Sequence, residues 1–351
     1  MTQLSKKQQQ IMDVLSRHGS LSSSHIHSEL SKAGENISLV TVKRELSAMT
    51  ATGLISPTGQ GRSRAYSMGT LGRILSGADP ALYCAIEPDK RSGLDRFNFD
   101  LFPSLPADIF TVAERAALDK ATHEYHRRSA NVALAIKQKE LERLIIELSW
   151  KSSKLEGNTY TLLDTEKLIL EHQEARGHDK KEARMILNHK DAFTFTREHR
   201  KDFRTLTRTN LEALHQVLTK GLGVNFGFRQ KPVGVTGSKY RPLDNRYQIQ
   251  EAVDALAAAI ERMATPYAKA LVALIGVSYI QPFEDGNKRT ARLMANALLL
   301  AYDCAPLSYR SIEEKDYREA GLVFYELNAI RPFKQLFMEQ YVFAANNYLA
   351  A

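Results

Sequence analysis

Hydrophobic residues recur at helical spacing along most of the chain after Thr111. The spacing predicts helices at about 113–138, 141–154, 165–176, 181–198, 208–221, 248–263, 266–280, 287–302, 313–326 and 333–348. Such a succession indicates a helical bundle. Residues 228–245 break the period, because β-branched residues mix there with two glycines and two prolines, and we expect a short β-hairpin projecting from the bundle.

The first 70 residues follow a different pattern, with three short amphipathic helices and then a basic hairpin. Serines at Ser22–Ser24 and Ser38 are suited to cap the second and third helices. Gly59 and Gly61 can turn the hairpin, which carries Arg62 and Arg64. The residues expected inside this region are Ile11, Leu15, Ile26, Leu30, Val40, Leu46 and Met49.

This order of elements resembles a winged helix-turn-helix domain. The resemblance implies that the third helix, with Thr41, Lys43 and Arg44 exposed, enters a DNA major groove while the arginines of the wing contact phosphates. Docking to another protein is the alternative role. Glycines and prolines among charged residues predict a connector with a little structure of its own over residues 71–110.

Composition adds limits to this picture. A length of 351 residues with 43% hydrophobic content predicts two or three domains, and a net charge of +8 gives modest support to a polyanionic partner. The opening residues lack an apolar signal core, and the apolar run at 271–280 is shorter than the roughly 20 residues of a membrane helix. We therefore expect a soluble cytoplasmic protein without membrane contact. Cys84 and Cys304 exclude a disulfide framework or a multi-cysteine zinc site.

The stretch IQPFEDGNKRTAR at 280–292 carries the main candidate chemistry. Its loop leads into a helix that starts near Asn287, where free N–H groups attract anions and Gly286 permits close approach of a phosphate. Arg289 and Arg292 are three residues apart, so they share a helical face and can bind further phosphates. Asp285 beside phosphates would need a cation such as Mg²⁺. The alternative is a capped helix start whose arginines pair with neighbouring carboxylates.

The full string resembles the Fic family signature HPFxDGNxRxxR, and the resemblance extends over about residues 141–348. It matches at Pro282, Phe283, Asp285, Gly286, Asn287, Arg289 and Arg292. The resemblance implies a mainly α fold, a Fic-type helical bundle with a β-hairpin flap, and transfer of AMP from ATP to hydroxyl side chains of a target protein. ATP and Mg²⁺ would be the cofactors.

Residue roles follow from the same resemblance. Asp285 would hold Mg²⁺ and Phe283 would anchor the loop, although any core phenylalanine could do the latter. Arg292 would bind the γ-phosphate, and Tyr317 would lie at the adenine end or simply belong to the core. The flap would present the target segment by backbone pairing. The remaining nucleotide contacts would be Gly286, Asn287, Lys288 and Arg289 at the phosphates and Val235, Thr236, Gly237 and Ser238 at the flap.

A second match to the family lies in WKSSKLEGNTYT, within a helix expected at about 141–157. Members regulated in cis carry an inhibitory pattern [S/T]xxxE[G/N], which Ser152, Glu156 and Gly157 satisfy. The resemblance implies that Glu156 pairs with Arg292 and denies that arginine to the γ-phosphate. The alternative is an exposed glutamate at a helix end that Gly157 caps.

The chain departs from the signature at its first position, where Gln281 stands in place of the histidine that takes the proton from the target hydroxyl. An amide cannot act as a base near neutral pH. Loss of a positioned base costs about 10²–10⁴ in rate, or roughly 3–5 kcal/mol, while phosphate binding should survive. Gln281 is either natural to a subgroup or an introduced substitution, or another residue such as His189 or His215 supplies the base.

The predicted organisation is a winged helix at 1–70, a connector at 71–110, a helical region at 111–204 and a Fic core at 205–351. The first hypothesis is an ATP-binding AMP transferase restrained by Glu156 and impaired by Gln281. The second is a catalytically silent, ATP-sensing regulator that binds DNA, and a weaker third is removal of AMP from a modified protein. The target and the oligomeric state stay open, and a dimer is compatible with the sequence.

Overall fold

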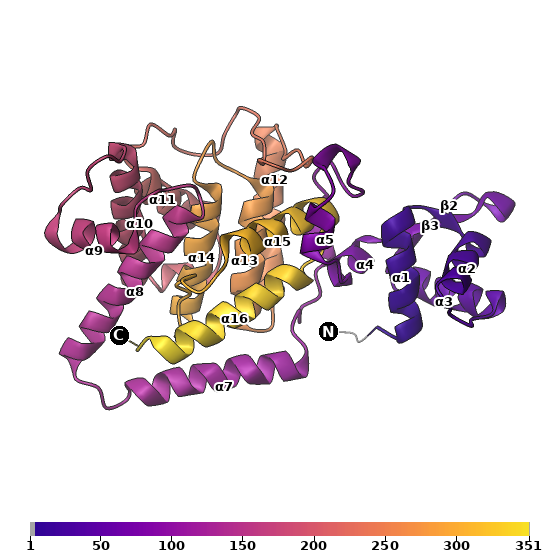
Figure 1. The fold of residues 1–351 in the computed structure, drawn as a ribbon, viewed down its shortest axis with the longest axis horizontal. Coiled ribbons are helices and arrows are strands. Elements are labelled where there is room, and N and C mark those ends of the chain that lie inside the picture. The colour runs from indigo at the N-terminus through magenta and orange to yellow at the C-terminus, as the bar shows by residue number, and fades with distance from the viewer. Residues whose placement is uncertain (1–3, 351) are drawn as a thin grey trace. The chain divides into compact units, whose positions relative to one another are not determined.

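The computed structural model describes residues 4–350, so the predicted ends of the first and last domains, at residues 1–3 and 351, lie outside it. The described chain is mainly α-helical, as expected, with one small sheet near its N-terminus (Figure 1). The α-helices are α1 (Lys6–His18), α2 (Ser23–Lys32), α3 (Leu39–Ala51), α4 (Thr70–Leu75), α5 (Pro80–Cys84), α6 (Leu101–Ser104), α7 (Val112–Ser129), α8 (Leu134–Lys154), α9 (Leu162–Glu171), α10 (Lys180–Glu198), α11 (Arg208–Thr219), α12 (Arg246–Arg262), α13 (Pro266–Ile280), α14 (Asn287–Ala301), α15 (Glu314–Leu327) and α16 (Arg331–Asn347). The strands are β1 (Leu21–Ser22), β2 (Ile55–Thr58) and β3 (Ala65–Met68).

The chain divides into two compact units that do not follow sequence order. The first unit comprises the residues up to Pro106 together with Val235–Arg241 and Arg318–Lys334. The second unit comprises Ala107–Gly234, Pro242–Tyr317 and the residues from Gln335 onward. Two short segments from late in the sequence therefore pack with the N-terminal residues, a grouping that the sequence did not suggest. The four predicted domain ranges remain predictions.

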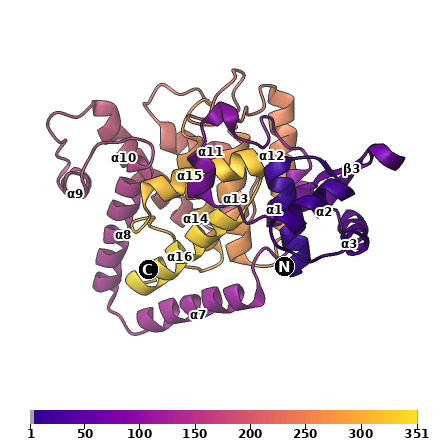
Figure 2. The same ribbon diagram turned by 45° about the vertical axis from the view of Figure 1, so that its right-hand side comes forward.

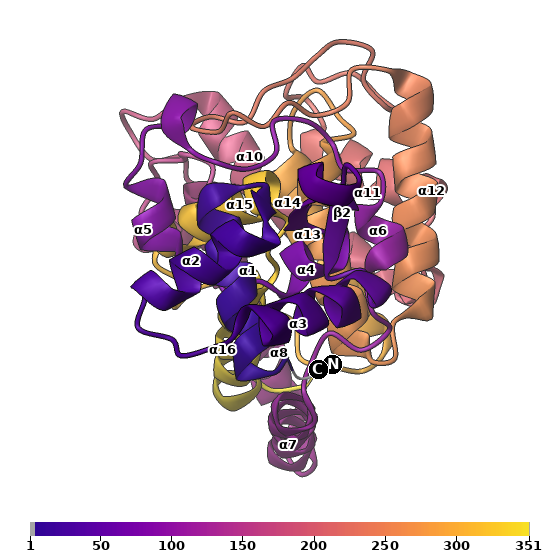
Figure 3. The same ribbon diagram turned by 90° about the vertical axis from the view of Figure 1, so that its right-hand side faces the viewer.

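The winged-helix pattern is present in the first unit. Figures 1 and 3 show α1, α2 and α3 grouped with the strands. The sheet has the order β1-β3-β2 with antiparallel pairs, and β2 and β3 form the expected hairpin. Ser22 and Ser38 cap α2 and α3, because each side chain accepts a hydrogen bond from a backbone N–H of the first turn.

One predicted core residue of this region is wrong. Val40 is 78% exposed, whereas Val42, Leu46 and Met49 of the same helix are fully buried. The helix begins at Leu39, and residues three or four apart from Leu46 share its buried face. Val42 meets that spacing and Val40 does not, so the hydrophobic phase of α3 was assigned two residues too early.

The second unit is built around α13 and α14, which pack against each other. Figures 1 and 2 show them between α10 and α11 on one side and α12 on the other. Every residue of α13 from Ala270 to Ile280 is buried. The approach of α12 explains Gly276, because a Cβ atom there would lie 2.3 Å from a methyl carbon of Leu256. The loop between α13 and α14 is thus held by two deeply buried helices. No helix in the described range combines the length and apolar character needed to cross a bilayer.

Two details of the predicted elements differ from the structure. The helix expected over 113–138 ends at Ser129, and α8 begins at Leu134 after a break that holds neither glycine nor proline to signal it. Residues 228–245 contain no regular strand, although Ser238 N donates to Val235 O at 3.1 Å and closes a turn. Prolines in both stems cannot donate ladder hydrogen bonds, which accounts for the missing hairpin pairing.

Candidate active site

The loop between α13 and α14 begins and ends with a left-handed residue. Gln281 has φ 52° and ψ 57° and ends α13, and Gly286 has φ 80° and begins α14. This conformation is ordinary for glycine and uncommon for glutamine. The Gln281 side chain is buried and folds back, since its Nε2 donates to Ser278 O at 2.7 Å. Position 281 is therefore fixed both by its backbone and by its amide.

Asn287 closes the loop from the helix side. Its Nδ2 donates to Phe283 O and its Oδ1 accepts from Phe283 N, both at 2.8 Å. Phe283 is fully buried, as the anchor role requires. No side chain caps α14 at Gly286, so the N–H groups of the first turn face the loop without a capping oxygen. The asparagine holds the loop in shape, and the backbone offers the anion site.

His215 lies directly against this loop, which its position in the sequence did not reveal. Its ring stacks on Phe283 with centroids 3.7 Å apart, and its Nε2 is 2.9 Å from Asp285 O. A carbonyl oxygen only accepts, so Nε2 carries the proton and Nδ1 is left buried without a partner. Burial lowers the pKa of His215 to about 4. The imidazole is neutral at physiological pH and supports the loop backbone.

Asp285 and Arg289 form an ion pair at the outer side of the loop. Arg289 Nη2 is 3.1 Å from Asp285 Oδ2, and the guanidinium is buried whereas the carboxylate is 68% exposed. Burial lowers the pKa of Arg289 below its ordinary value, although the neighbouring carboxylates oppose this. Its Nη1 is buried without a hydrogen-bond partner. A buried donor of this kind has capacity left for an additional acceptor.

Arg292 is the most completely enclosed charge of the site. Its Nε donates to Ser152 Oγ, and its Nη2 donates to Ser152 O and to Glu156 Oε1, all at 2.8 Å. Lys288 Nζ approaches the other carboxylate oxygen of Glu156 at 3.7 Å. Burial opposes ionisation of Glu156, but the charges of Arg292 and Lys288 outweigh it and hold its pKa below the ordinary value. Arg292 Nη1 is buried without a partner.

The segment that supplies Glu156 combines both alternatives considered for it. Helix α8 starts earlier than expected and ends at Lys154, so Glu156 lies in the turn after the helix and not inside a helix that reaches about residue 157. Gly157 has φ 94° and makes this turn, while Asn158 N donates to Ser153 O at 3.2 Å. A glycine-terminated helix end therefore aims Glu156 at the arginine. The carboxylate is both near the helix end and engaged.

Two further predicted residues lie near Arg292. Tyr317 is buried, and its ring centroid is 5.6 Å from the guanidinium carbon. His189, on α10, is fully buried, and neither ring nitrogen has a hydrogen-bond partner. Burial first, and then the charges of Arg292 and Arg289, lower the pKa of His189 well below its ordinary value. Neither side chain is exposed at the surface.

The flap residues Val235, Thr236, Gly237 and Ser238 belong to the first unit. Gly237 O accepts from Arg91 Nη1 at 3.0 Å, and Ser238 Oγ donates to Glu326 Oε1 at 2.7 Å. Arg91 and Glu326 are themselves paired at 3.3 Å and buried. Sequence reasoning missed this pair, because a connector arginine and a helical glutamate resemble solvated surface charges. The pair fixes the turn at its tip.

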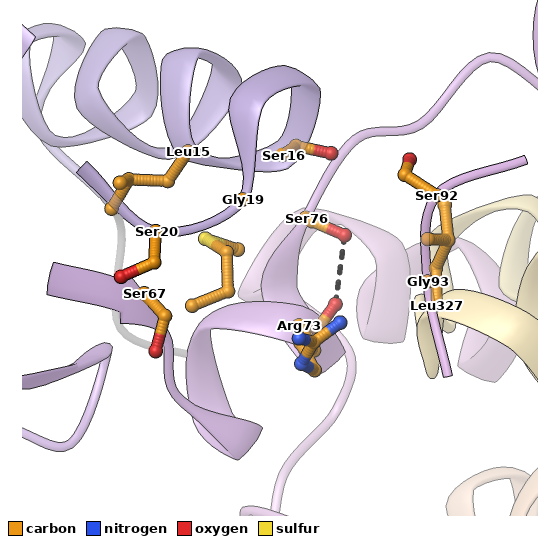
Figure 4. Close-up of a pocket in the computed structure, with 11 residues that line it drawn as sticks. Leu15, Ser16, Gly19, Ser20, Ser67, Arg73, Ser76, Ser92, Gly93 and Leu327 are labelled. Atoms are coloured by element: carbon orange, nitrogen blue, oxygen red, sulfur yellow. Dashed lines mark hydrogen bonds between the residues drawn. The ribbon is translucent and has the colours of Figure 1, made fainter. Parts of the chain in front are cut away.

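The first unit also contains a hollow of about 240 Å³. Figure 4 shows Ser16, Ser20, Ser67 and Arg73 around it, with Ser76 Oγ donating to Arg73 O at 2.8 Å. It lies beside α1, β3 and α4 and shares no residue with the predicted site. In the described range no group of three or more His, Cys, Asp or Glu residues is arranged to hold a metal ion.

Two family models match the chain. The Fic/DOC family matches residues 205–299, which include the loop and most of α14, and the penicillinase repressor family matches residues 4–70. No curated protein sequence matches the chain.

Solved structures of Fic proteins match about two thirds of this chain. A Fic domain-containing signaling protein from Bacteroides thetaiotaomicron is 18% identical with a TM-score of 0.54, and the match covers 66% of this chain and 94% of that one. A Fic family protein from Desulfovibrio desulfuricans is 22% identical with a TM-score of 0.55, covering 69% and 75%. A fragment of Fic-1 from C. elegans is 17% identical with a TM-score of 0.51, covering 67% and 69%. At these identities the likeness establishes the fold.

The fold and the loop together define a helical domain of the Fic type. Residues 205–299 of this chain form a Fic/DOC domain, and residues 4–70 form an N-terminal domain of the penicillinase repressor, winged-helix type.

Proposed function

We propose that this chain binds ATP with Mg²⁺ at the loop before α14 and is of the class that transfers AMP to hydroxyl side chains of a target protein. The uncapped start of α14 offers backbone N–H groups to phosphate oxygens. Arg289 and Arg292 each have a buried amino group without a partner, which supports an anionic ligand beside them. Lys288, next to them, adds a third positive charge.

The donor set also fits a magnesium ion that is shared with phosphates. The Asp285 carboxylate is largely exposed, so a cation can reach it. Its Oδ2 is also paired with Arg289 Nη2 at 3.1 Å. Mg²⁺ commonly takes one or two protein carboxylates and completes its shell with phosphate oxygens and water. In that position the ion would neutralise part of the phosphate charge. Asp285 and Asn287 would then hold the ion and the loop respectively.

Restraint by Glu156 is the regulatory part of the proposal, and the contact between Glu156 and Arg292 is the observation that carries the whole proposal. The hydrogen bonds from Arg292 to Ser152 and Glu156 use the forked donors that a γ-phosphate would use. ATP must therefore compete with a carboxylate that is already in place. The buried position of Arg292 makes this competition strong, because a desolvated guanidinium needs an acceptor.

The side chains present limit proton transfer. Gln281 cannot accept a proton, and its amide is held by Ser278 O. His215 has a pKa of about 4, and its Nε2 is used on Asp285 O. His189 is fully enclosed. We therefore propose that the site retains nucleotide and performs transfer slowly, because a base matched to neutral pH is missing from these positions.

Calorimetric titration of the full chain with Mg²⁺ and ATP tests the proposal. Glu156→Gly should bind ATP more tightly than the unaltered chain, and Arg292→Ala more weakly. In the double variant the gain from Glu156→Gly should vanish, since the carboxylate then has no arginine to block. Equal affinities of Glu156→Gly and the unaltered chain would remove the restraint. No binding in either would remove the nucleotide site.

A second candidate function is a transcriptional regulator whose Fic/DOC domain senses ATP without catalysis. The match of residues 4–70 to the penicillinase repressor family supports it. Lys43 and Arg44 are exposed on α3, and Arg62 and Arg64 are exposed between β2 and β3, as a groove helix and a wing require.

DNA binding can be tested with fluorescently labelled promoter fragments at several salt concentrations. Binding through these cations should weaken steeply with salt, because it releases counterions from the phosphates. Arg62→Ala with Arg64→Ala should reduce the salt dependence. An affinity that stays the same at every salt concentration would contradict a DNA-binding role.

A further inference from the structure

Arg229 is a buried arginine that lies between α11 and α12, and only 2% of it is exposed. Its Nε donates to Gln281 O at 2.6 Å, its backbone N donates to Pro282 O at 2.9 Å, and its Nη1 donates to Lys231 O at 2.9 Å. Its Nη2 also donates to Leu243 O. One side chain therefore contacts the signature loop and both stems of the segment 228–245.

The position of this charge is favourable despite its burial. Gln281 is the residue that ends α13, where the aligned peptide dipoles leave partial negative charge on the last carbonyls. A guanidinium keeps its proton at any ordinary pH and has five donors in a rigid fork. Carbonyl oxygens from three separate stretches accept hydrogen bonds from Nε, Nη1 and Nη2. The same bonds stabilise the left-handed backbone of Gln281, which glutamine adopts reluctantly.

The stems of the segment need such a link. Residues 228–245 form no strand with one another, and the isolated bridge in the segment joins Arg241 to Arg96, so ladder hydrogen bonds do not join Lys231 to Leu243. Arg229 bonds to the carbonyls of both residues and so fixes their separation. Because the same side chain fixes the carbonyl of Gln281, movement of the stems and movement of the loop are tied together.

We propose that Arg229 is a positioning residue of the site, which holds residue 281 in register with the segment that presents the target. The role of Arg229 in positioning the target rests on the proposed function. Its effect on the order of the loop and of the two stems does not. A displacement of about 1 Å at a reacting group can cost on the order of 10²-fold in rate. Phosphate binding, which uses α14, should change little.

Hydrogen exchange on the full chain tests the ordering. Arg229→Met keeps the length of the side chain and removes its donors, and Arg229→Lys keeps the charge and loses the fork. Both should speed amide exchange in 231–243 and 281–286 by about tenfold or more, with Met the larger effect, while exchange in the rest of the second unit stays unchanged. Arg246→Met is the matched control, because Arg246 is exposed just beyond the segment. Unchanged exchange in both segments, or a uniform increase across the unit, would overturn the proposal.

A kinetic measurement distinguishes this inference from the proposed function. In a Glu156→Gly, Gln281→His background, adding Arg229→Lys should lower kcat for AMP transfer by about 10–100-fold and change the Kd for Mg²⁺-ATP by less than about threefold. Equal losses in kcat and ATP affinity would contradict a positioning role. If that background shows no transfer at all while the exchange result holds, the proposed function fails and Arg229 still orders the loop.

Discussion

Two buried arginines flank the signature loop, and they are bound in different ways. Arg292 is held by the hydroxyl and the carbonyl of Ser152 and by the Glu156 carboxylate in the turn after α8, whereas Arg229 is held by main-chain carbonyl oxygens. A side-chain carboxylate can swing away and leave its arginine to another anion. A backbone carbonyl cannot leave without unfolding its segment. The difference suggests that the Arg292 side of the loop is exchangeable and that the Arg229 side is permanent.

The largest expected effect is at Gln281, the first residue of the signature loop. In the Glu156→Gly background, Gln281→His should raise AMP transfer from labelled ATP to proteins of a cell extract by about 10²–10⁴, because it supplies a base. Gln281→Asn in the same background should give no increase. Equal transfer with glutamine, asparagine and histidine at position 281 would show that this position does not limit the reaction.

The exchangeable side can be probed through stability. Glu156→Gly removes the carboxylate partner of a buried charge and should lower the free energy of unfolding by about 3 kcal/mol in urea titration. Saturating Mg²⁺-ATP should restore most of the loss, because the phosphates would give Arg292 new acceptors. Arg229→Met should also destabilise the chain, but ATP should not restore it. Equal restoration of both variants would erase the distinction between the two arginines.

A guanidinium keeps its proton at ordinary pH, so we expect the pH dependence of stability around the loop to come from histidine. The folded-state pKa of His215 is lowered to about 4 from an ordinary 6.5, so the unfolded chain binds more protons in that interval. Stability should therefore fall as pH drops from about 6.5 towards 4, by up to about 1.4 kcal/mol per pH unit for one proton. Glu156 adds a loss of the same sign at the acid end, because the charges of Arg292 and Lys288 hold its pKa below the ordinary value against the effect of burial.

The variant His215→Gln should reduce that slope in urea titrations at successive pH values, while His189 keeps a contribution of its own, since its pKa is also lowered. An unchanged slope in His215→Gln would mean that His215 is not the protonated group.

The smallest expected effect is at Ser152. Ser152→Ala removes one hydrogen bond to Arg292 Nε and leaves the backbone contact and Glu156 in place. A single hydrogen bond to a charged group is worth about 1.5–3 kcal/mol at most, and ATP must break fewer contacts in the variant. ATP affinity by calorimetry should rise by less than it does in Glu156→Gly. A larger rise would make the serine the principal restraint.

The sequence predicted much of the fold, because helical periodicity and serine caps are local signals. The cap at Ser38 and the helix that starts at Asn287 were found in this way. The phase of α3 at Val40 failed, although the spacing from Leu46 favours Val42 for the buried face. The break between α7 and α8 carried no glycine or proline signal.

Site residues that belong to a sequence motif could be predicted, whereas residues that reach the loop only through tertiary contacts could not. The pairing of Glu156 with Arg292 was expected from resemblance, and the structure brings these residues together at 2.8 Å. His215 on the loop and Arg229 beneath it gave no signal, because a histidine or arginine in a helix or loop is common in any sequence. Their contacts with the loop join residues more than 50 positions apart.

The partners of Arg292 lie 136 and 140 residues before it, ahead of the segment that matches the Fic/DOC family. On the proposed function, inhibitor and site are made in equal number with every copy synthesised, so expression level cannot change their ratio. The local concentration of the carboxylate is likewise set by covalent connection and by packing rather than by abundance. Such a device would respond to the supply of nucleotide in the cell and would be insensitive to how many molecules of the protein are present.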